Sequence, residues 1–499
     1  MIKSICILGG GTAGFMTAAI LSKLNLKVKC IYSSDIGIIG VGESTQTRIN
    51  DVFNFLGLKD EEWMPKCNAT YKTNIGFESW STPGEQFFFP FEPINGKNIN
   101  EFFELISLFP DEVNSLQFSR YACYSSRFAE LNKLSRDGWD FDRNTAYHFD
   151  THLLSKLLYE ISQTNGVEFV DDTYISSVQN EDGIEYLTCK DSGNHYADLF
   201  VDCSGFKSLL LGEELNVPFV SYADTLINNR VITAKIPYQN KNKQLKNYTN
   251  NISMRNGWCW EIPLWDGISV GYVHTLKFSS KEEIEKEFVD RYGVKSTRVI
   301  DFKSGRRESG WVKNVASVGL AYGFIEPLES TGLVSVITNI FRLLEVITKT
   351  KNINSFDRTM FNVAVNDELD TQRGFIDMHY ALSHRSDTEY WKYVIQKIKY
   401  NWNEKNAVYC LNMSIFERDY SKLQYGGLPF ILAGNGYSPY SPGFITSMKY
   451  AYNLEYYEIM KNEWLKDDLE LSNKFFQYDT SYEFTKKEIY DKYNKVIKY

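Results

Sequence analysis

Three glycines near the start of the chain have the spacing of a loop that holds phosphate groups. The pattern Gly9-x-Gly11-x-x-Gly14 follows an apolar run and precedes an Ala/Leu-rich stretch. Glycines let a pyrophosphate approach the backbone, and the amides at the start of the next helix donate hydrogen bonds to its oxygens. The pattern alone is weak, because such loops also form tight turns. A strand before it and a helix after it predict a dinucleotide site.

Three further segments combine bulky and ionisable residues in an uncommon order. Residues 257–263 read G-W-C-W-E-I-P, residues 68–77 contain Lys72, and residues 326–332 read E-P-L-E-S-T-G. Each segment has a plain structural interpretation as well. Two strand tryptophans on one face can simply pack a core, a lysine is most often solvated, and Glu-Ser-Thr is good capping chemistry at a helix start.

Taken together, these segments resemble the flavin-dependent tryptophan halogenases. Residues 40–45, G-V-G-E-S-T, are similar to the second glycine-rich segment of that family, and residues 202–206 resemble a strand-to-loop contact of FAD-dependent monooxygenases. Residues 146–153, 221–224 and 379–391 also resemble the family, so the resemblance extends from residue 2 to beyond 440. It implies an α/β chain with the Rossmann-like FAD-binding monooxygenase/halogenase fold.

The resemblance implies that Lys72 and Glu329 are catalytic. A lysine can hydrogen-bond hypohalous acid, or be halogenated by it, and direct this electrophile at one carbon of a bound ring. A carboxylate can stabilise the cationic ring intermediate and accept its proton. By the same resemblance Thr331 and Gly332 bind halide, where amides at a helix start supply donors for an anion.

The double-tryptophan motif is implied to shield the flavin. In the family it keeps the organic substrate away from the flavin, so that halide reacts there instead of the ring. Two indoles fill space that a hydroxylase would leave open. The residues of this motif are Trp258, Trp260, Ile262 and Pro263.

The implied FAD contacts come from the glycine loop and from three later segments. They are Gly9, Gly11, Thr12, Ala13, Gly14, Val41, Glu43, Leu320, Ser330 and Leu333. One departure concerns the acidic residue that commonly holds a ribose at the end of the second strand. Tyr32 occupies that position and Asp35 follows three residues later. The ribose contact therefore stays open, whereas the pyrophosphate site does not depend on it.

The implied reaction uses FAD in its reduced form, FADH2, with O2 to oxidise a halide ion, the co-substrate, to hypohalous acid. That acid then halogenates a small electron-rich aromatic substrate, indole-like or phenolic. Because no second nucleotide fingerprint is evident, a separate flavin reductase is the implied partner. Two alternatives stay open: an FAD-dependent aromatic hydroxylase of the same fold, which Trp258 and Trp260 disfavour, and a flavin-binding protein without turnover, which Lys72 and Glu329 disfavour.

Apolar periodicity and turn residues predict the elements that must position these residues. The chain should begin with a β-α-β unit. A helix should lie near residues 152–162, and two hairpins should turn at Asp182-Gly183 and Ser192-Gly193. The other expected elements are strands at 199–203, within 231–275 and at 315–320, and a long helix that begins at 326–332 and passes Leu343.

The predicted organisation has two parts. Residues 1–345 form an FAD-binding core with interleaved β-sheet insertions for the substrate at about 80–150 and 231–290. Residues 346–499 are rich in Tyr, Lys and Glu at helical spacing, which predicts a mainly helical C-terminal region. Within it, the segment 430–440 is short and rich in turn residues. It looks more like the corresponding segment of family members that take indoles and other free arenes. Free tryptophan is not the leading expectation, and a carrier-bound substrate stays open.

Composition excludes several classes of protein. A formal net charge of -9 without a basic stripe argues against a nucleic-acid partner. No stretch reaches the ~18 apolar residues of a membrane span, and eight scattered cysteines fit reduced thiols in a cytoplasmic protein. His148 and His152 lack a third ligand, so no metal site is predicted. A homo-oligomer stays open.

Overall fold

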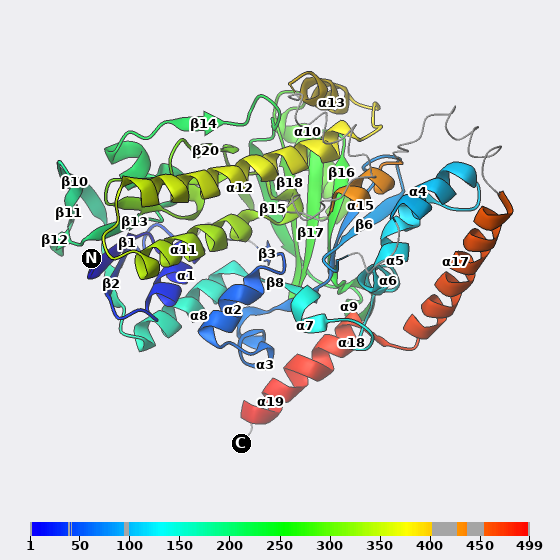
Figure 1. The fold of residues 1–499 in the computed structure, drawn as a ribbon, viewed down its shortest axis with the longest axis horizontal. Helices are drawn as coiled ribbons and strands as arrows, with labels where there is room; N and C mark the ends of the chain where they lie inside the picture. The colour runs from blue at the N-terminus through cyan, green and yellow to red at the C-terminus, as the bar shows by residue number, and fades with distance from the viewer. Residues whose placement is uncertain are drawn as a thin grey trace.

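The computed structural model describes residues 2–37, 40, 42–93, 99–401, 427–436 and 454–497. Figure 1 shows a sheet near the N-terminus and a second, larger sheet beside it, with the long helix α12 (Ser355–Ala381) running from one toward the other. The chain is therefore a mixed α/β protein, as the sequence predicts.

The first sheet has six strands and contains the predicted β-α-β unit. Strand β1 (Ser4–Leu8), helix α1 (Thr12–Leu21) and strand β2 (Lys27–Tyr32) follow in that order, and β1 and β2 pair in parallel. The sheet order is β21-β22-β13-β1-β2-β9. The remaining strands are β9 (Glu168–Asp171), β13 (Leu199–Asp202), β21 (Trp311–Val312) and β22 (Val315–Ser317).

The second sheet has seven strands and joins segments that are far apart in the sequence. Its order is β19-β15-β18-β17-β16-β5-β6, and only the β16–β5 pair is parallel. The strands are β5 (Asn74–Glu78), β6 (Gln86–Pro90), β15 (Arg230–Ile236), β16 (Tyr248–Met254), β17 (Gly257–Leu264), β18 (Gly267–His274) and β19 (Arg298–Asp301). This arrangement confirms the strands expected within residues 231–275.

A small third sheet brings two predicted site segments together. Strand β8 (Ala146–Asp150) pairs with β3 (Gly42–Ser44) on one side and with β4 (Thr70–Lys72) on the other. The predicted flavin segment and the predicted catalytic lysine thus flank the same central strand.

Smaller sheets complete the strand inventory. The predicted turns at Asp182-Gly183 and Ser192-Gly193 connect the strands of a three-stranded antiparallel sheet. The strands of these smaller sheets are β10 (Tyr174–Asn180), β11 (Gly183–Cys189), β12 (Gly193–Tyr196), β14 (Phe219–Ser221), β20 (Gly305–Arg307), β23 (Gly323–Phe324), β7 (Lys133–Leu134) and β24 (Asp479–Thr480).

Side-chain caps set the start of two helices near the site. The Asp150 carboxylate accepts hydrogen bonds from the amides of His152 and Leu153 at the start of α8 (Thr151–Thr164), the helix expected at 152–162. Asn354 and Asp357 form a capping box at the start of α12. The expected long helix is α11 (Gly332–Lys349), which packs against both α1 and α12.

The other helices lie mainly in two stretches of the chain. One stretch, within the first predicted insertion, is helical between β6 and β8. The helices are α2 (Ile49–Leu56), α3 (Asp60–Trp63), α4 (Ile99–Leu108), α5 (Phe118–Ala122), α6 (Tyr124–Leu131), α7 (Phe141–Asn144), α9 (Lys241–Gln244), α10 (Lys281–Tyr292), α13 (Glu389–Asn401), α15 (Leu428–Gly434), α17 (Leu454–Phe475), α18 (Ser481–Thr485) and α19 (Asp491–Ile497). The described part of residues 346–499 is mainly helical, while the division into domains stays a prediction.

One expected strand is shorter than predicted. The segment 315–320 leaves the sheet after Ser317 and forms the short helical turn Gly319–Ala321. Gly319 has a φ of 72°, in the left-handed region that glycine tolerates, so the extended backbone ends here.

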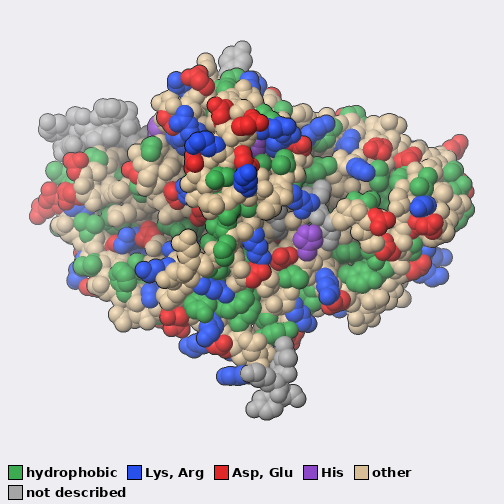
Figure 2. All heavy atoms as spheres, turned by 180° about the vertical axis from the view of Figure 1, so that it is seen from behind, with side chains coloured by type: hydrophobic (Ala, Val, Ile, Leu, Met, Phe, Trp, Pro, Cys, Tyr) green, Lys and Arg blue, Asp and Glu red, His purple; other side chains and the backbone are tan. Residues whose placement is uncertain are grey.

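The surface and the cysteines bear on the features that composition predicted. Figure 2 shows Lys and Arg side chains interspersed with Asp and Glu over the visible face, without a continuous basic stripe. Cysteines in the described residues are free and buried. Within the same residues, no helix is both long enough and apolar enough to cross a bilayer.

Candidate active site

Lys72 is fully buried at the end of β4. Its Nζ donates to the carbonyl oxygen of Thr45 at 2.7 Å and to Ser330 Oγ at 2.9 Å, and it lies 4.8 Å from the centre of the Phe91 ring. Burial lowers the pKa of Lys72 well below its usual range, while the nearby carboxylates of Glu329 and Glu43 act in the opposite direction. A solvated surface lysine, the plain alternative, is excluded.

Glu329 is also fully buried, at the end of the short helical turn Pro327–Glu329. Its Oε1 lies 2.6 Å from His379 Nε2, and its backbone carbonyl accepts a hydrogen bond from Gln46 Nε2 at 2.7 Å. Burial raises the pKa of Glu329, whereas His379 and Lys72 lower it. Ser330, the next residue, is the side chain that contacts Lys72, so the two predicted catalytic residues belong to one buried cluster.

A chain of hydrogen-bonded side chains leads from Lys72 to the strand with the two tryptophans. In order, its members are Ser330, Ser44, Thr249, His148 and Thr70, and it ends on the carbonyl oxygen of Pro263. Both ring nitrogens of His148 are engaged, and burial lowers the pKa of this imidazole well below its usual range. His148 is therefore a neutral structural histidine. Over the described part of the chain, no group of three or more His, Cys, Asp or Glu is arranged to hold a metal ion.

Thr331 and Gly332 lie where α11 begins, next to Glu329. The Thr331 hydroxyl is buried and has no hydrogen-bond partner among the described residues. The first amides of a helix lack intrahelical acceptors, so this corner offers donors for an anion. Glu43 lies close to this corner, because a Cβ on Gly332 would be 3.8 Å from Glu43 Oε1. Burial raises the pKa of Glu43 to about 7.

The glycine loop has the shape that a pyrophosphate requires. A Cβ on Gly9 would lie 2.2 Å from the Cys203 carbonyl oxygen, and one on Gly14 would lie 1.9 Å from the Gly9 carbonyl oxygen, so both positions need glycine. A Cβ on Gly11, at the start of α1, would meet no atom within 4 Å. The space beside Gly11 is therefore open, which is compatible with the predicted site for the phosphates of FAD.

The other predicted FAD residues divide between the two ends of the site. Thr12 Oγ1 contacts Ser155 Oγ at 3.0 Å, and a Cβ on Gly319, the neighbour of Leu320, would lie 2.8 Å from Ala13 Cβ. Leu333 is buried in the first turn of α11, near the predicted halide residues. Val41 lies outside the described residues. The Tyr32 ring packs against Phe15, Tyr159 and Phe169.

Trp258 and Trp260 lie on one face of β17 with their ring centres 6.2 Å apart. Both indoles are buried, and the Trp260 indole nitrogen has no hydrogen-bond partner among the described residues. Asn251, the partner of Trp260 on β16, donates to the Leu328 carbonyl oxygen at 2.6 Å. The motif is thus bonded to the Glu329 segment through Asn251 and to the Lys72 strand through Pro263.

The site predicted from the sequence does not include some residues of the buried cluster. His379 lies within the stretch 379–391 that resembles the family, and His148 lies within 146–153, but the sequence showed no role for either. Glu326 is fully buried, accepts a hydrogen bond from the Tyr380 hydroxyl at 2.6 Å, and burial raises its pKa to about 7. Only its place before Pro327 in the predicted segment pointed to it.

The family model described as tryptophan halogenase matches residues 4–444 of the chain. Tryptophan 6-halogenase SttH of Streptomyces toxytricini is 34% identical over 426 residues, covering 78% of this chain and 80% of the relative. The 7-chloro-L-tryptophan 6-halogenase KtzR of Kutzneria sp. (strain 744) is 34% identical over 422 residues, covering 77% and 80%.

Solved structures agree with these relatives. The apo structure of VirX1 superposes with a TM-score of 0.91 at 33% identity, over 98% of this chain and all of the other. Flavin-dependent halogenases are among the further structural neighbours. The protein therefore belongs to the tryptophan halogenase family, and it is a flavin-dependent enzyme that uses FAD and halide.

Proposed function

We propose that the protein halogenates a small electron-rich arene, indole-like or phenolic, with hypohalous acid made from halide, O2 and FADH2. The observation that carries the proposal is the buried cluster of Lys72, Ser330 and Glu329. An amine and a carboxylate kept from water beside each other suit the control of an electrophile and of a proton.

Lys72 is proposed to hold the hypohalous acid. In its protonated form Lys72 has three N–H donors, and the contacts with Thr45 and Ser330 use two of them. The third remains to donate to the oxidant. Because both acceptors belong to buried residues, they give the Lys72 Nζ a fixed direction, and the electrophile reaches one region of the arene.

The halide and flavin ends of the site have separate tasks. When bound, FADH2 supplies, with O2, the oxidising power that converts halide to hypohalous acid. The Thr331 hydroxyl and the amides at the start of α11 are proposed to hold the halide. Trp258 and Trp260 are proposed to exclude the arene from the flavin, which separates oxidation of the halide from halogenation of the ring.

The proposal extends to the class of substrate and to the partner. SttH and KtzR are named for tryptophan, whose ring is an indole, which supports an indole-like arene for this chain. Residues 430–436 of the segment 430–440 form the end of α15 and the turn after it, and residues 437–440 lie outside the described residues. A separate flavin reductase is proposed to deliver FADH2.

The test measures products by mass spectrometry after incubation with O2, chloride or bromide, enzymatically reduced FAD and a panel of indoles and phenols. Halogenated product is expected from the wild type only when halide is present. Lys72→Ala should lose all halogenated product while it still binds FAD, because the oxidant no longer has its donor.

Lys156→Ala is the matched control, since Lys156 is an exposed lysine on α8, and its product yield should equal that of the wild type. Halogenated product from Lys72→Ala would overturn the role of the lysine. Hydroxylated product in halide-free buffer would instead favour the aromatic hydroxylase, and no turnover of any arene would favour the non-catalytic flavoprotein.

A further inference from the structure

His379 lies against the proposed catalytic carboxylate but has no assigned task. It is buried near the C-terminal end of α12, and its Nε2 lies 2.6 Å from Glu329 Oε1. Its Nδ1 lies 2.8 Å from the carbonyl oxygen of Phe375. The imidazole is thus enclosed between a backbone acceptor and a carboxylate.

These two contacts define where the protons are. A carbonyl oxygen can only accept, so Nδ1 carries a hydrogen. In a neutral ring Nε2 would then present a lone pair to the carboxylate oxygen, and two acceptors at 2.6 Å repel unless a proton lies between them. A proton on Nε2 makes this contact an ion pair, and the positive imidazolium then favours the ionised form of the Glu329 carboxylate.

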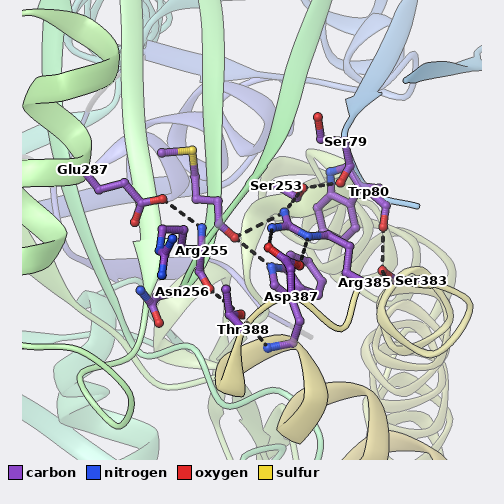
Figure 3. A network of polar contacts seen from close by, with 12 residues as sticks. Ser79, Trp80, Ser253, Arg255, Asn256, Glu287, Ser383, Arg385, Asp387 and Thr388 are labelled. Carbon is purple, nitrogen blue, oxygen red and sulfur yellow. Dashed lines mark hydrogen bonds and ion pairs between the residues drawn. The ribbon is translucent and has the colours of Figure 1, made fainter. Parts of the chain in front are cut away.

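The loop after α12 holds the histidine in place. Figure 3 shows Arg385 and Ser383 tied to the end of β16 and to the residues after β5. Arg385 Nη1 donates to Ser253 Oγ, its Nε and Nη2 donate to the Asp387 carboxylate at 2.9 and 2.7 Å, and Ser383 Oγ donates to the Trp80 carbonyl oxygen. The end of α12 is thereby bonded to the seven-stranded sheet, and His379 has little freedom to leave Glu329.

The remaining oxygen of the carboxylate is free to react. Glu329 Oε2 is buried and has no hydrogen-bond partner among the described residues. An acceptor without a partner in a buried site can take a proton from a bound molecule.

We propose that His379 is a positioning residue for Glu329, holding Oε1 and keeping the carboxylate ionised so that Oε2 takes the proton displaced from the arene. This inference rests on the proposed function. In the step concerned, the C–H bond at the halogenated ring carbon breaks, its electron pair restores the aromatic ring, and the proton bonds to Oε2.

Other charged groups face this pair from several elements. They are Lys72 on β4, Glu43 on β3 and the buried Glu326. Burial raises the pKa of Glu329, and His379 and Lys72 both lower it. Glu329 loses its function as a base when the pH falls through its pKa. Removing His379 takes away one group that lowers this pKa, so the acid limb of the rate profile should move to higher pH.

The experiment compares arene halogenation rates of the wild type and His379→Gln between about pH 5 and about pH 9. Glutamine keeps an N–H donor near Oε1 but carries no charge. The acid limb should move upward by about one pH unit, so the rate at a fixed pH on this limb falls roughly tenfold and recovers in more alkaline buffer. Release of hypohalous acid, followed with a small diketone trap in place of the arene, should stay unchanged.

His274→Gln is the matched control, because His274 is also buried and its Nδ1 also contacts a backbone carbonyl oxygen, that of Tyr272. It should leave the acid limb in place. If Glu329→Gln is inactive but the acid limb of the rate profile does not move in His379→Gln, the role of His379 is overturned while the proposed function stands. Full activity of Glu329→Gln would overturn the role of Glu329 in the proposed function.

Discussion

Thr331 carries a buried hydroxyl that meets no hydrogen-bond partner in the described residues. An orphaned buried hydroxyl costs roughly 1–3 kcal/mol, and a bound halide that accepts from it would recover part of this cost. Thr331→Val should raise the KM for halide several-fold, because the isosteric side chain lacks the donor, and it should leave the melting temperature equal or higher. Steady-state rates against bromide concentration check the first part and thermal unfolding the second.

Thr338→Val, further along α11, is the comparison variant and should leave the halide KM unchanged. An unchanged halide KM in Thr331→Val would remove the hydroxyl from the proposed halide site. A lower melting temperature would show that a partner for the hydroxyl exists in the folded protein.

At the scale of elements, β17 and β18 fit together through one glycine. Gly271 pairs with Trp260, and a Cβ on Gly271 would lie 2.1 Å from Cζ2 of the indole. Gly271→Ala must therefore displace the tryptophan, and overpacking of this kind costs roughly 1–3 kcal/mol. We expect a lower melting temperature and less halogenated product per FADH2 consumed, measured by calorimetry and by product yield.

A second substitution distinguishes displacement of the indole from a general loss of stability. Phenylalanine lacks the indole atoms that meet the new methyl group, so Gly271→Ala with Trp260→Phe should recover much of the melting temperature but not the product yield. Recovery of both would contradict a shielding role for Trp260.

At the scale of the whole molecule, residues near the end of the chain support the strand that carries Lys72. Tyr490, in the helical turn between α18 and α19, stacks on Trp265 with ring centres 3.7 Å apart, and its hydroxyl donates to the Ala69 carbonyl oxygen at 3.0 Å. Trp265 in turn donates its backbone N–H to Asn68 at 2.9 Å. The contacted residues, Asn68 and Ala69, immediately precede β4 in the chain.

Tyr490→Ala should therefore weaken both the fold and the reaction. Loss of a buried aromatic side chain costs roughly 3–5 kcal/mol, and the displaced β4 should lower kcat. Tyr490→Phe keeps the stack and loses only a hydrogen bond worth about 1 kcal/mol, so its kcat should stay near the wild type. Thermal unfolding and arene halogenation rates measure both effects. Equal kcat values for the two variants would argue against support of β4 by this contact.

The sequence by itself determined the elements and the family motifs. The β-α-β unit around Gly9, the hairpins at Asp182-Gly183 and Ser192-Gly193 and the strand with Trp258 depend on side-chain period and turn residues within a few positions. Such local preferences can be recognised along the chain. The end of the strand at Ser317 was missed, because a single glycine with positive φ interrupts an otherwise apolar run.

Only the tertiary structure decided how these motifs combine. Lys72 and its acceptor Ser330 are 258 positions apart, and Tyr490 and the Ala69 carbonyl that it contacts are 421 apart. The contact of His379 with Glu329 likewise depends on how α12 is tied to the seven-stranded sheet. Contacts of this kind follow from strand register and helix packing, which no local pattern encodes. The same packing removes the lysine and the carboxylate from water, and that burial sets their pKa values and hence their chemistry.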